Sequence, residues 1–153
     1  MLDDAYDLAL KALGYKERTE SELRAWLDER GVEDEEIDEV IALLAEVGAI
    51  DDAGFARRYA QDKQLLAGWG PDRIEVALES RGVAREHIDA ALAGEDEEAL
   101  LERATSILLG RGMACDSERE RERALGLLVR RGFPLELAYD AVRAAERRLG
   151  KAA

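Results

Sequence analysis

The chain has 153 residues, and its 35 acidic and 22 basic side chains give it a net charge of −13. Such an excess of acid is not typical of a general nucleic-acid binder, because phosphates attract Lys and Arg. The single cysteine, Cys115, excludes an intrachain disulfide. There is no apolar run long enough to span a bilayer and no basic-then-apolar leader, so we expect a cytoplasmic protein.

The first predicted repeat covers residues 1–50. Apolar spacing over residues 5–13 indicates a helix, and Thr19 with Glu22 forms a capping-box pattern that begins a second one. Gly31 ends that second helix, since a glycine adopts the left-handed backbone at little cost. A third helix follows and closes at Gly48.

The same order of elements recurs twice, with Gly82 and Gly132 standing 51 and 101 residues after Gly31. In the second repeat, residues 51–93, we predict a helix over 55–66, a helix that begins at Pro71, and a third that closes at Gly94. In the third repeat, residues 94–153, we predict a helix over 100–109, a second capped by Ser117 and Glu120, and a last one from Pro134. The chain is therefore predicted to be all-α, with three tandem three-helix repeats forming an elongated curved solenoid.

Apolar residues flank each glycine at fixed distances. Positions eight and four before it share one helix face, and positions six and ten after it share another. These expected core residues are Leu23, Leu27, Ile37 and Ile41, then Ile74, Leu78, Ile88 and Leu92, then Ala124, Leu128, Ala138 and Val142. Trp26 lies on the same helix as Leu23 and Leu27 and is also expected to pack on the core. On the helix over 55–66 the expected core face is Phe55, Tyr59, Ala60 and Leu66.

Charge is unevenly distributed along the chain. Residues 1–50 have a net charge of −10, whereas residues 119–151 have a net charge of +4. The predicted partner-binding residues at this basic end are Arg119, Arg123, Arg130, Arg131, Arg143 and Arg147, to which Trp69 and Arg73 are added. Such a face suits phosphates or an acidic protein surface, but the interleaved glutamates leave open that the arginines form internal salt bridges. Trp69, in a loop, is either a contact anchor or a plug between repeats.

The sequence predicts no catalytic, cofactor-binding or metal-ligating residue. We expect Asp51 and Asp52 to cap the helix that follows them, because no further ligand is nearby. His87 is expected to be exposed, and Cys115 to be a partly buried small apolar residue. No glycine is followed by the Lys-Ser or Lys-Thr pair of a phosphate-binding loop. The chain is therefore not expected to be an enzyme.

Three blocks of this sequence resemble the RecX family. The blocks are Arg18-Thr19-Glu20-Ser21-Glu22-Leu23 with Leu27 and Arg30-Gly31, then Gly48-Ala49-Ile50-Asp51-Asp52-Ala53-Gly54-Phe55-Ala56, then Gly70-Pro71-Asp72-Arg73-Ile74 with Leu78 and Gly82. Their order and spacing match over about residues 5–92, and the third repeat fits through the repeat itself.

The resemblance implies a regulator of the RecA recombinase that is not an enzyme. Family members bind in the groove of the RecA filament on single-stranded DNA and limit its growth or stability, which reduces ATP hydrolysis, strand exchange and the SOS response. Family members are often basic, whereas this chain is acidic, so we expect weak or no binding to bare DNA, and we expect a monomer. Two alternatives use the same helices: a nucleic-acid-binding module that relies on the C-terminal arginines, and a scaffold for another protein.

Overall fold

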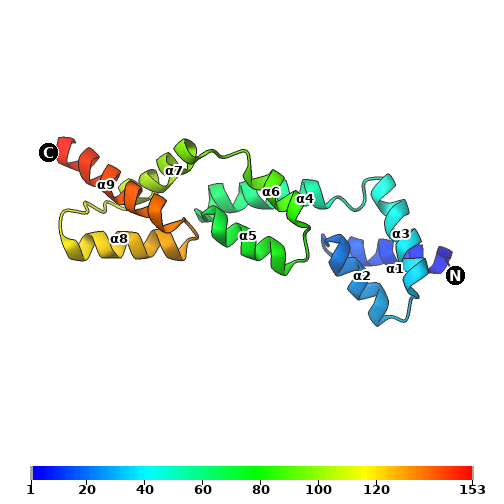
Figure 1. The fold of residues 1–153 in the computed structure, drawn as a ribbon. Coiled ribbons are helices and arrows are strands. Elements are labelled where there is room, and N and C mark those ends of the chain that lie inside the picture. The colour runs from blue at the N-terminus through cyan, green and yellow to red at the C-terminus, as the bar shows by residue number, and fades with distance from the viewer. Residues whose placement is uncertain (1, 153) are drawn as a thin grey trace. The chain divides into compact units, whose positions relative to one another are not determined.

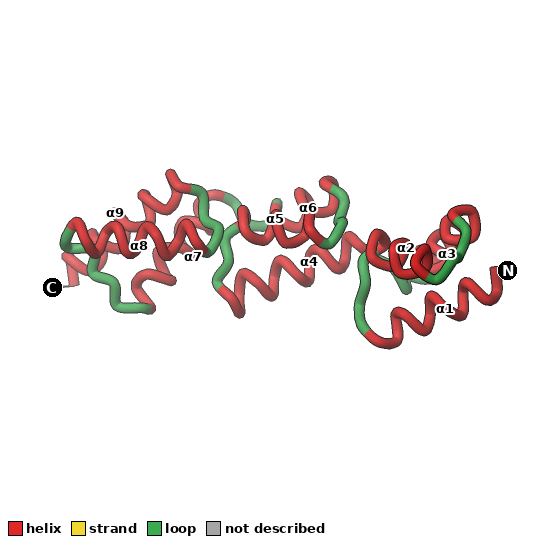
Figure 2. The backbone as a smooth tube through the Cα atoms, turned by 90° about the horizontal axis from the view of Figure 1, so that it is seen from below, coloured by secondary structure: helices red, strands yellow, loops and turns green. Residues whose placement is uncertain are grey.

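The computed structural model describes residues 2–152, which form nine α-helices and one π-helical turn with no strand among them (Figures 1 and 2). In chain order the elements are α1 (Leu2–Tyr15), α2 (Glu20–Glu29), α3 (Asp34–Glu46), α4 (Asp52–Asp62), the π-helical turn η1 (Lys63–Ala67), α5 (Pro71–Ser80), α6 (Arg85–Leu92), α7 (Glu97–Gly110), α8 (Glu118–Arg130) and α9 (Leu135–Ala152). The all-α prediction of three successive groups of three helices is confirmed.

The helix ends follow the predicted signals. Gly31, Gly82 and Gly132 have φ angles of 80°, 77° and 97°, so each hairpin turns through a left-handed residue. Thr19 completes both halves of its capping box with Glu22. Ser117 accepts a hydrogen bond from the Glu120 N–H, but the Glu120 carboxylate bonds the N–H of Asp116, so this box is only half formed.

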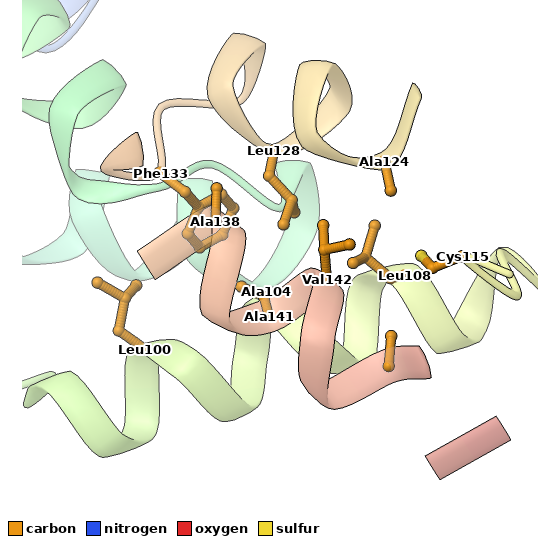
Figure 3. Close-up of a cluster of buried hydrophobic side chains, with 11 residues drawn as sticks. Leu100, Ala104, Leu108, Cys115, Ala124, Leu128, Phe133, Ala138, Ala141 and Val142 are labelled. Atoms are coloured by element: carbon orange, nitrogen blue, oxygen red, sulfur yellow. The ribbon is translucent and has the colours of Figure 1, made fainter. Parts of the chain in front are cut away.

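The predicted core positions are buried, with one exception. Eleven of the twelve are less than 5% exposed, whereas Leu92 is only half-buried because α6 ends at that residue. One cluster joins α1, α2 and α3, and half-buried Trp26 packs against it as expected. A second cluster joins α7, α8 and α9, and in Figure 3 Leu128 and Val142 point toward each other, with Phe133 on one side of them and Leu108 on the other.

The chain forms two compact units. Unit 1 is Met1–Arg58 with Leu78–Ala91, and unit 2 is Tyr59–Ala77 with Leu92–Ala153. The middle group of helices therefore contributes to both units, one part to each. The boundaries expected at residues 50 and 93, and the curved elongated form, stay predictions.

The prediction that Leu66 belongs to the buried face of the helix over residues 55–66 is wrong. The α-helix stops at Asp62, and the next five residues take the wider π-helical spacing, which rotates the side chains out of the α-helical register. Leu66 is 85% exposed instead of buried, and Leu65 beside it is 80% exposed. Within residues 2–152, no helix has the length and apolar character that crossing a membrane requires.

Candidate partner-binding surface

A first joint in unit 1 connects the start of α2 to the turn between α5 and α6. The Thr19 hydroxyl donates a hydrogen bond to the carbonyl of Arg81 (2.7 Å), and Gly82 lies against Ser21. A Cβ at Gly82 would collide with the Ser21 side chain, so close approach as well as the positive φ requires glycine here. The Arg81-Gly82 turn of the second repeat thus packs on α2, which is the second helix of the first repeat.

The guanidinium of Arg81 is fully engaged in this first joint. It donates to both carboxylate oxygens of Glu22 (2.8 and 3.1 Å) and lies 4.6 Å from the centre of the Phe55 ring. Burial acts to raise the pKa of Glu22, but hydrogen bonds from Arg81 and from the Thr19 N–H outweigh it, and the net effect is a lowered pKa. Arg81 therefore has a carboxylate and an aromatic ring as internal partners.

A second joint in unit 2 repeats this arrangement between α5 and the turn after α8. The N–H of Gly70 donates to the carbonyl of Arg131 (2.7 Å), and the N–H of Asp72 donates to that of Gly132 (2.9 Å). Two carbonyls of the turn after α8 thus accept hydrogen bonds from amides at the start of α5, and Asp72, in the first turn of that helix, gains a partner that the helix itself does not supply. A Cβ at Gly132 would collide with Arg73, which again makes the close approach depend on glycine.

The two joints differ in charge. Glu22 stands nine residues before Gly31, and the residue nine before Gly82 is Arg73. The Arg73 guanidinium lies 4.1 Å from the centre of the Trp69 ring, and the Lys63 ammonium lies 4.7 Å from the same ring. In the part of the chain that the structure describes, Lys63, Arg73 and Arg131 make no ion pair. The second joint is therefore cationic, whereas the first is neutralised.

Arginines also line a groove along α8. The groove has a volume of about 370 Å³, and Arg119, Arg123 and Arg130 lie on one stripe of the helix, at spacings of four and seven residues. Arg111, after the end of α7, completes what we call the arginine groove. One carboxylate, that of Glu122, lines it, and none of the four arginines has an ion pair among the described residues.

Other arginines of this region are neutralised. Arg121 pairs with Glu146 (3.1 Å) and Arg148 pairs with Glu102 (2.6 Å). Arg143, one of the predicted site residues, pairs with Asp140 on its own helix (2.7 Å).

The structure thus divides the predicted site residues into three sets. Arg119, Arg123 and Arg130 share the arginine groove. Trp69, Arg73 and Arg131 lie at the second joint, and a long hydrogen bond from Arg73 to the carbonyl of Arg130 (3.5 Å) connects the two sets. Arg143 and Arg147 line two other hollows, so neither belongs to the arginine groove.

Sequence reasoning missed two cationic residues. Lys63 has a signal, because Tyr59 stands four residues before it and the two contact each other on one helical face (5.4 Å from ammonium to ring centre). The sequence contains no signal for Arg111, because this residue joins the arginine groove only through the packing of α7 on the other helices. Trp69 is half-buried, with Tyr59 edge-on at 6.5 Å, and it holds cations instead of offering an open ring.

The remaining chemical candidates have structural roles. Asp51 caps α4 by accepting from the Gly54 N–H (3.0 Å), as predicted, but Asp52 caps a different helix, accepting from the Glu20 N–H at the start of α2 (3.0 Å). The expectation that both cap α4 is therefore wrong for Asp52. His87 is half-buried, and Cys115 is fully buried, with burial raising the pKa of its thiol. Among the described residues, no group of three or more His, Cys, Asp or Glu could hold a metal ion.

These features define an all-α repeat protein with a cationic surface on an otherwise acidic chain. Two family models match it: "RecX, first three-helix domain" over residues 5–44 and "RecX, second three-helix domain" over residues 51–92. The chain belongs to the RecX family of regulatory proteins.

Named relatives and solved structures agree with this assignment. The chain is 33% identical to regulatory protein RecX of Mycolicibacterium smegmatis, covering 92% of this chain and 78% of the relative, and 36% identical to that of Mycolicibacterium vanbaalenii, covering 93% and 82%. The crystal structure of RecX from Lactobacillus salivarius has the same fold, with a TM-score of 0.81 at 23% identity over 98% of this chain and 97% of that one. A second crystal structure of regulatory protein RecX superposes with a TM-score of 0.75 at 25% identity, covering 94% and 71%.

Proposed function

We propose that this protein binds the filament that RecA forms on single-stranded DNA and inhibits it, and so restrains recombination, DNA repair and the SOS response. Membership in the RecX family supports a regulatory role. The RecA partner comes from the sequence resemblance described above. We also propose that it acts in the cytoplasm, as a monomer and without catalysis of its own.

The main support for contact with the filament comes from the arginine groove of unit 2. Among the described residues, no guanidinium of the arginine groove has a carboxylate within ion-pair distance, although the chain as a whole is strongly acidic. Such a set of arginines attracts an acidic surface or phosphates, and along α8 it extends about 16 Å from Arg119 to Arg130, at 1.5 Å per residue. A filament presents both kinds of anion, whereas bare DNA presents only one.

Binding of this kind inhibits through steric and electrostatic effects. A helical repeat protein lodged on the filament competes with incoming DNA and with motions between RecA protomers. The acidic first repeat, with a net charge of −10 over residues 1–50, opposes binding to bare DNA.

The test is inhibition of the DNA-dependent ATP hydrolysis of RecA by the parent protein and by a triple Arg119→Glu, Arg123→Glu, Arg130→Glu variant. The three sites are exposed, so helicity and thermal stability should change little. We expect the variant to lose inhibition and filament binding. The matched control is Arg143→Glu with Arg147→Glu, two exposed arginines outside the groove, which should inhibit like the parent.

The unpaired arginine groove also favours a second candidate function, a nucleic-acid-binding module that acts without RecA. The same proteins distinguish the two in a pull-down with the assembled filament, free RecA and bare single-stranded DNA. Equal binding to bare DNA and filament would support the module. A parent protein that neither binds the filament nor changes ATP hydrolysis would contradict the proposed RecA function.

A further inference from the structure

Leu65 and Leu66 form an apolar surface that the fold does not cover. They are 80% and 85% exposed, the highest values among the large apolar side chains of the described residues. Both lie in η1, and π-helical turns occur often at functional sites. Burying such side chains against a partner is favourable in proportion to the apolar surface that is removed from water.

The turn that presents these leucines is held in place on both sides. Arg103 donates to the carbonyl of Gln64 (3.4 Å), and its guanidinium is itself fixed by two hydrogen bonds to Glu95 (2.7 and 3.0 Å). The Trp69 N–H donates to the carbonyl of Lys63 (2.9 Å) across the left-handed Gly68. Because these bonds already fix the backbone of the turn, binding needs to order only the two leucine side chains.

Arg131 lies beside the leucines and has no carboxylate partner within residues 2–152. Together with Leu65, Leu66 and Ile107 it lines a groove of about 430 Å³, and its guanidinium rests against Gly68. The equivalent residue of the preceding repeat, Arg81, contacts the Glu22 carboxylate and the Phe55 ring. The repeat itself thus indicates which partners this arginine position accepts: a carboxylate and an apolar side chain.

We propose that Leu65, Leu66 and Arg131 form a docking surface for a protein segment that carries a carboxylate beside apolar side chains. The segment supplies to Arg131 what Glu22 and Phe55 supply to Arg81, while its apolar residues cover the two leucines. This inference rests on the proposed function and deepens it: the segment belongs to the RecA protein of the filament, not to its DNA. Exposed leucines and an unpaired arginine in a shallow groove fit a protein surface better than a phosphate chain, since a nucleic-acid backbone offers nothing to cover the leucines.

The test compares a Leu65→Gln, Leu66→Gln double variant and an Arg131→Glu variant with matched controls. Val76→Gln is the apolar control, because Val76 is 64% exposed on α5, and Arg57→Glu is the charge control, because Arg57 is exposed on α4 without an ion pair among the described residues. Affinities are measured for RecA protein without DNA, for the assembled filament and for bare single-stranded DNA. Sedimentation of the parent and variants monitors self-association, and thermal unfolding monitors the fold.

We expect both test variants to lose at least about tenfold in affinity for RecA protein and for the filament, as for a small hot spot. Both controls should bind like the parent, and the double leucine variant should keep its affinity for bare DNA. A double leucine variant that stays folded and binds RecA protein and filament like the parent overturns the docking surface while the proposed function stands. A change confined to bare-DNA binding, or the loss of a parent dimer, assigns the surface to DNA or to a second copy and also overturns it. A parent that binds neither RecA protein nor filament removes the proposed function and this surface with it.

Discussion

Asp52, the first residue of α4, caps the start of α2, because its carboxylate accepts a hydrogen bond from the backbone N–H of Glu20 (3.0 Å). The bond joins two residues 32 positions apart and lies entirely within unit 1. It is formed by a carboxylate whose ionised form is disfavoured, since burial raises the pKa of Asp52. The hydrogen bond from Glu20 therefore stabilises the folded state, whereas the burial of the charged carboxylate destabilises it.

Replacing Asp52 separates these two effects. Asp52→Ala removes the acceptor for Glu20 and should lower the free energy of unfolding by about 1 kcal/mol, as for a lost helix cap. Asp52→Asn keeps an acceptor oxygen and removes the charge. Because a raised pKa means that folding loses stability as pH rises above the ordinary value of 3.8, Asp52→Asn should be as stable as the parent or more stable at pH 7. Urea unfolding at pH 7 measures both, and an Asn variant as unstable as the Ala variant would contradict this account.

The ion pair of the first joint should weaken in acid. The pKa of Glu22 is lowered, so its contribution is complete above the ordinary value of 4.5 and is lost as pH falls through the lowered pKa. A double-mutant cycle with Glu22→Gln and Arg81→Gln should give a coupling energy of about 0.5–1 kcal/mol at pH 7, since both side chains are partly exposed. The same cycle at pH 3 should give a smaller value. A coupling energy independent of pH would mean that packing, not charge, joins the two residues.

Gly82 and Gly31 offer a matched pair for the cost of a close approach. Their φ angles are 77° and 80°, but a Cβ at Gly82 meets Ser21, whereas a Cβ at Gly31 meets nothing within 4 Å. Gly31→Ala should cost about 1 kcal/mol through backbone strain alone. Gly82→Ala should cost clearly more, because the first joint must also open. Equal losses in chemical unfolding would show that the joint adjusts freely around a methyl group.

The arginine groove should contribute measurably to salt dependence if it meets phosphates. Each phosphate contact on a single strand contributes about −0.7 to the slope of log K against log salt. Arg119→Gln, Arg123→Gln and Arg130→Gln should therefore each make the slope for filament binding less steep by up to about that amount. Arg121→Gln, whose arginine is already paired with Glu146, is the control and should leave the slope unchanged. An unchanged slope in all four would place phosphates outside the groove.

Much of the fold could be predicted because its signals are local. A glycine after a helix, a proline at its first turn and apolar residues three or four apart each act within one or two turns of chain, so Gly82, Pro71 and Leu78 could be assigned from their neighbours. The prediction was wrong where the helical spacing changed without a local sequence signal. The shift to π-helical spacing after Asp62 has no clear sequence signal, and it exposed Leu66.

The candidate surface was less predictable because charge pairing depends on which helices meet. Arg119 and Arg121 look alike in the sequence, yet of the two only Arg121 forms an ion pair within the described part of the chain, with Glu146 on α9. Likewise the sequence places Asp52 at the start of a helix but does not reveal that the helix it caps is α2. Local patterns specify helix faces, and only the packed structure specifies their partners.

The division of the chain into units has a consequence for how the protein is made. Unit 1 needs Leu78–Ala91 to complete it, because the Arg81 carbonyl and Gly82 fill the first joint. During synthesis, the first three helices therefore leave the ribosome before Arg81 and Gly82, which pack on the start of α2, have been added to the chain. After Glu46, about 45 more residues, up to Ala91, must be synthesised before unit 1 is complete, which takes a few seconds at typical translation rates. In that interval Thr19 and Glu22 can close only their own capping box, and the net charge of −10 over residues 1–50 makes copies of this segment repel one another.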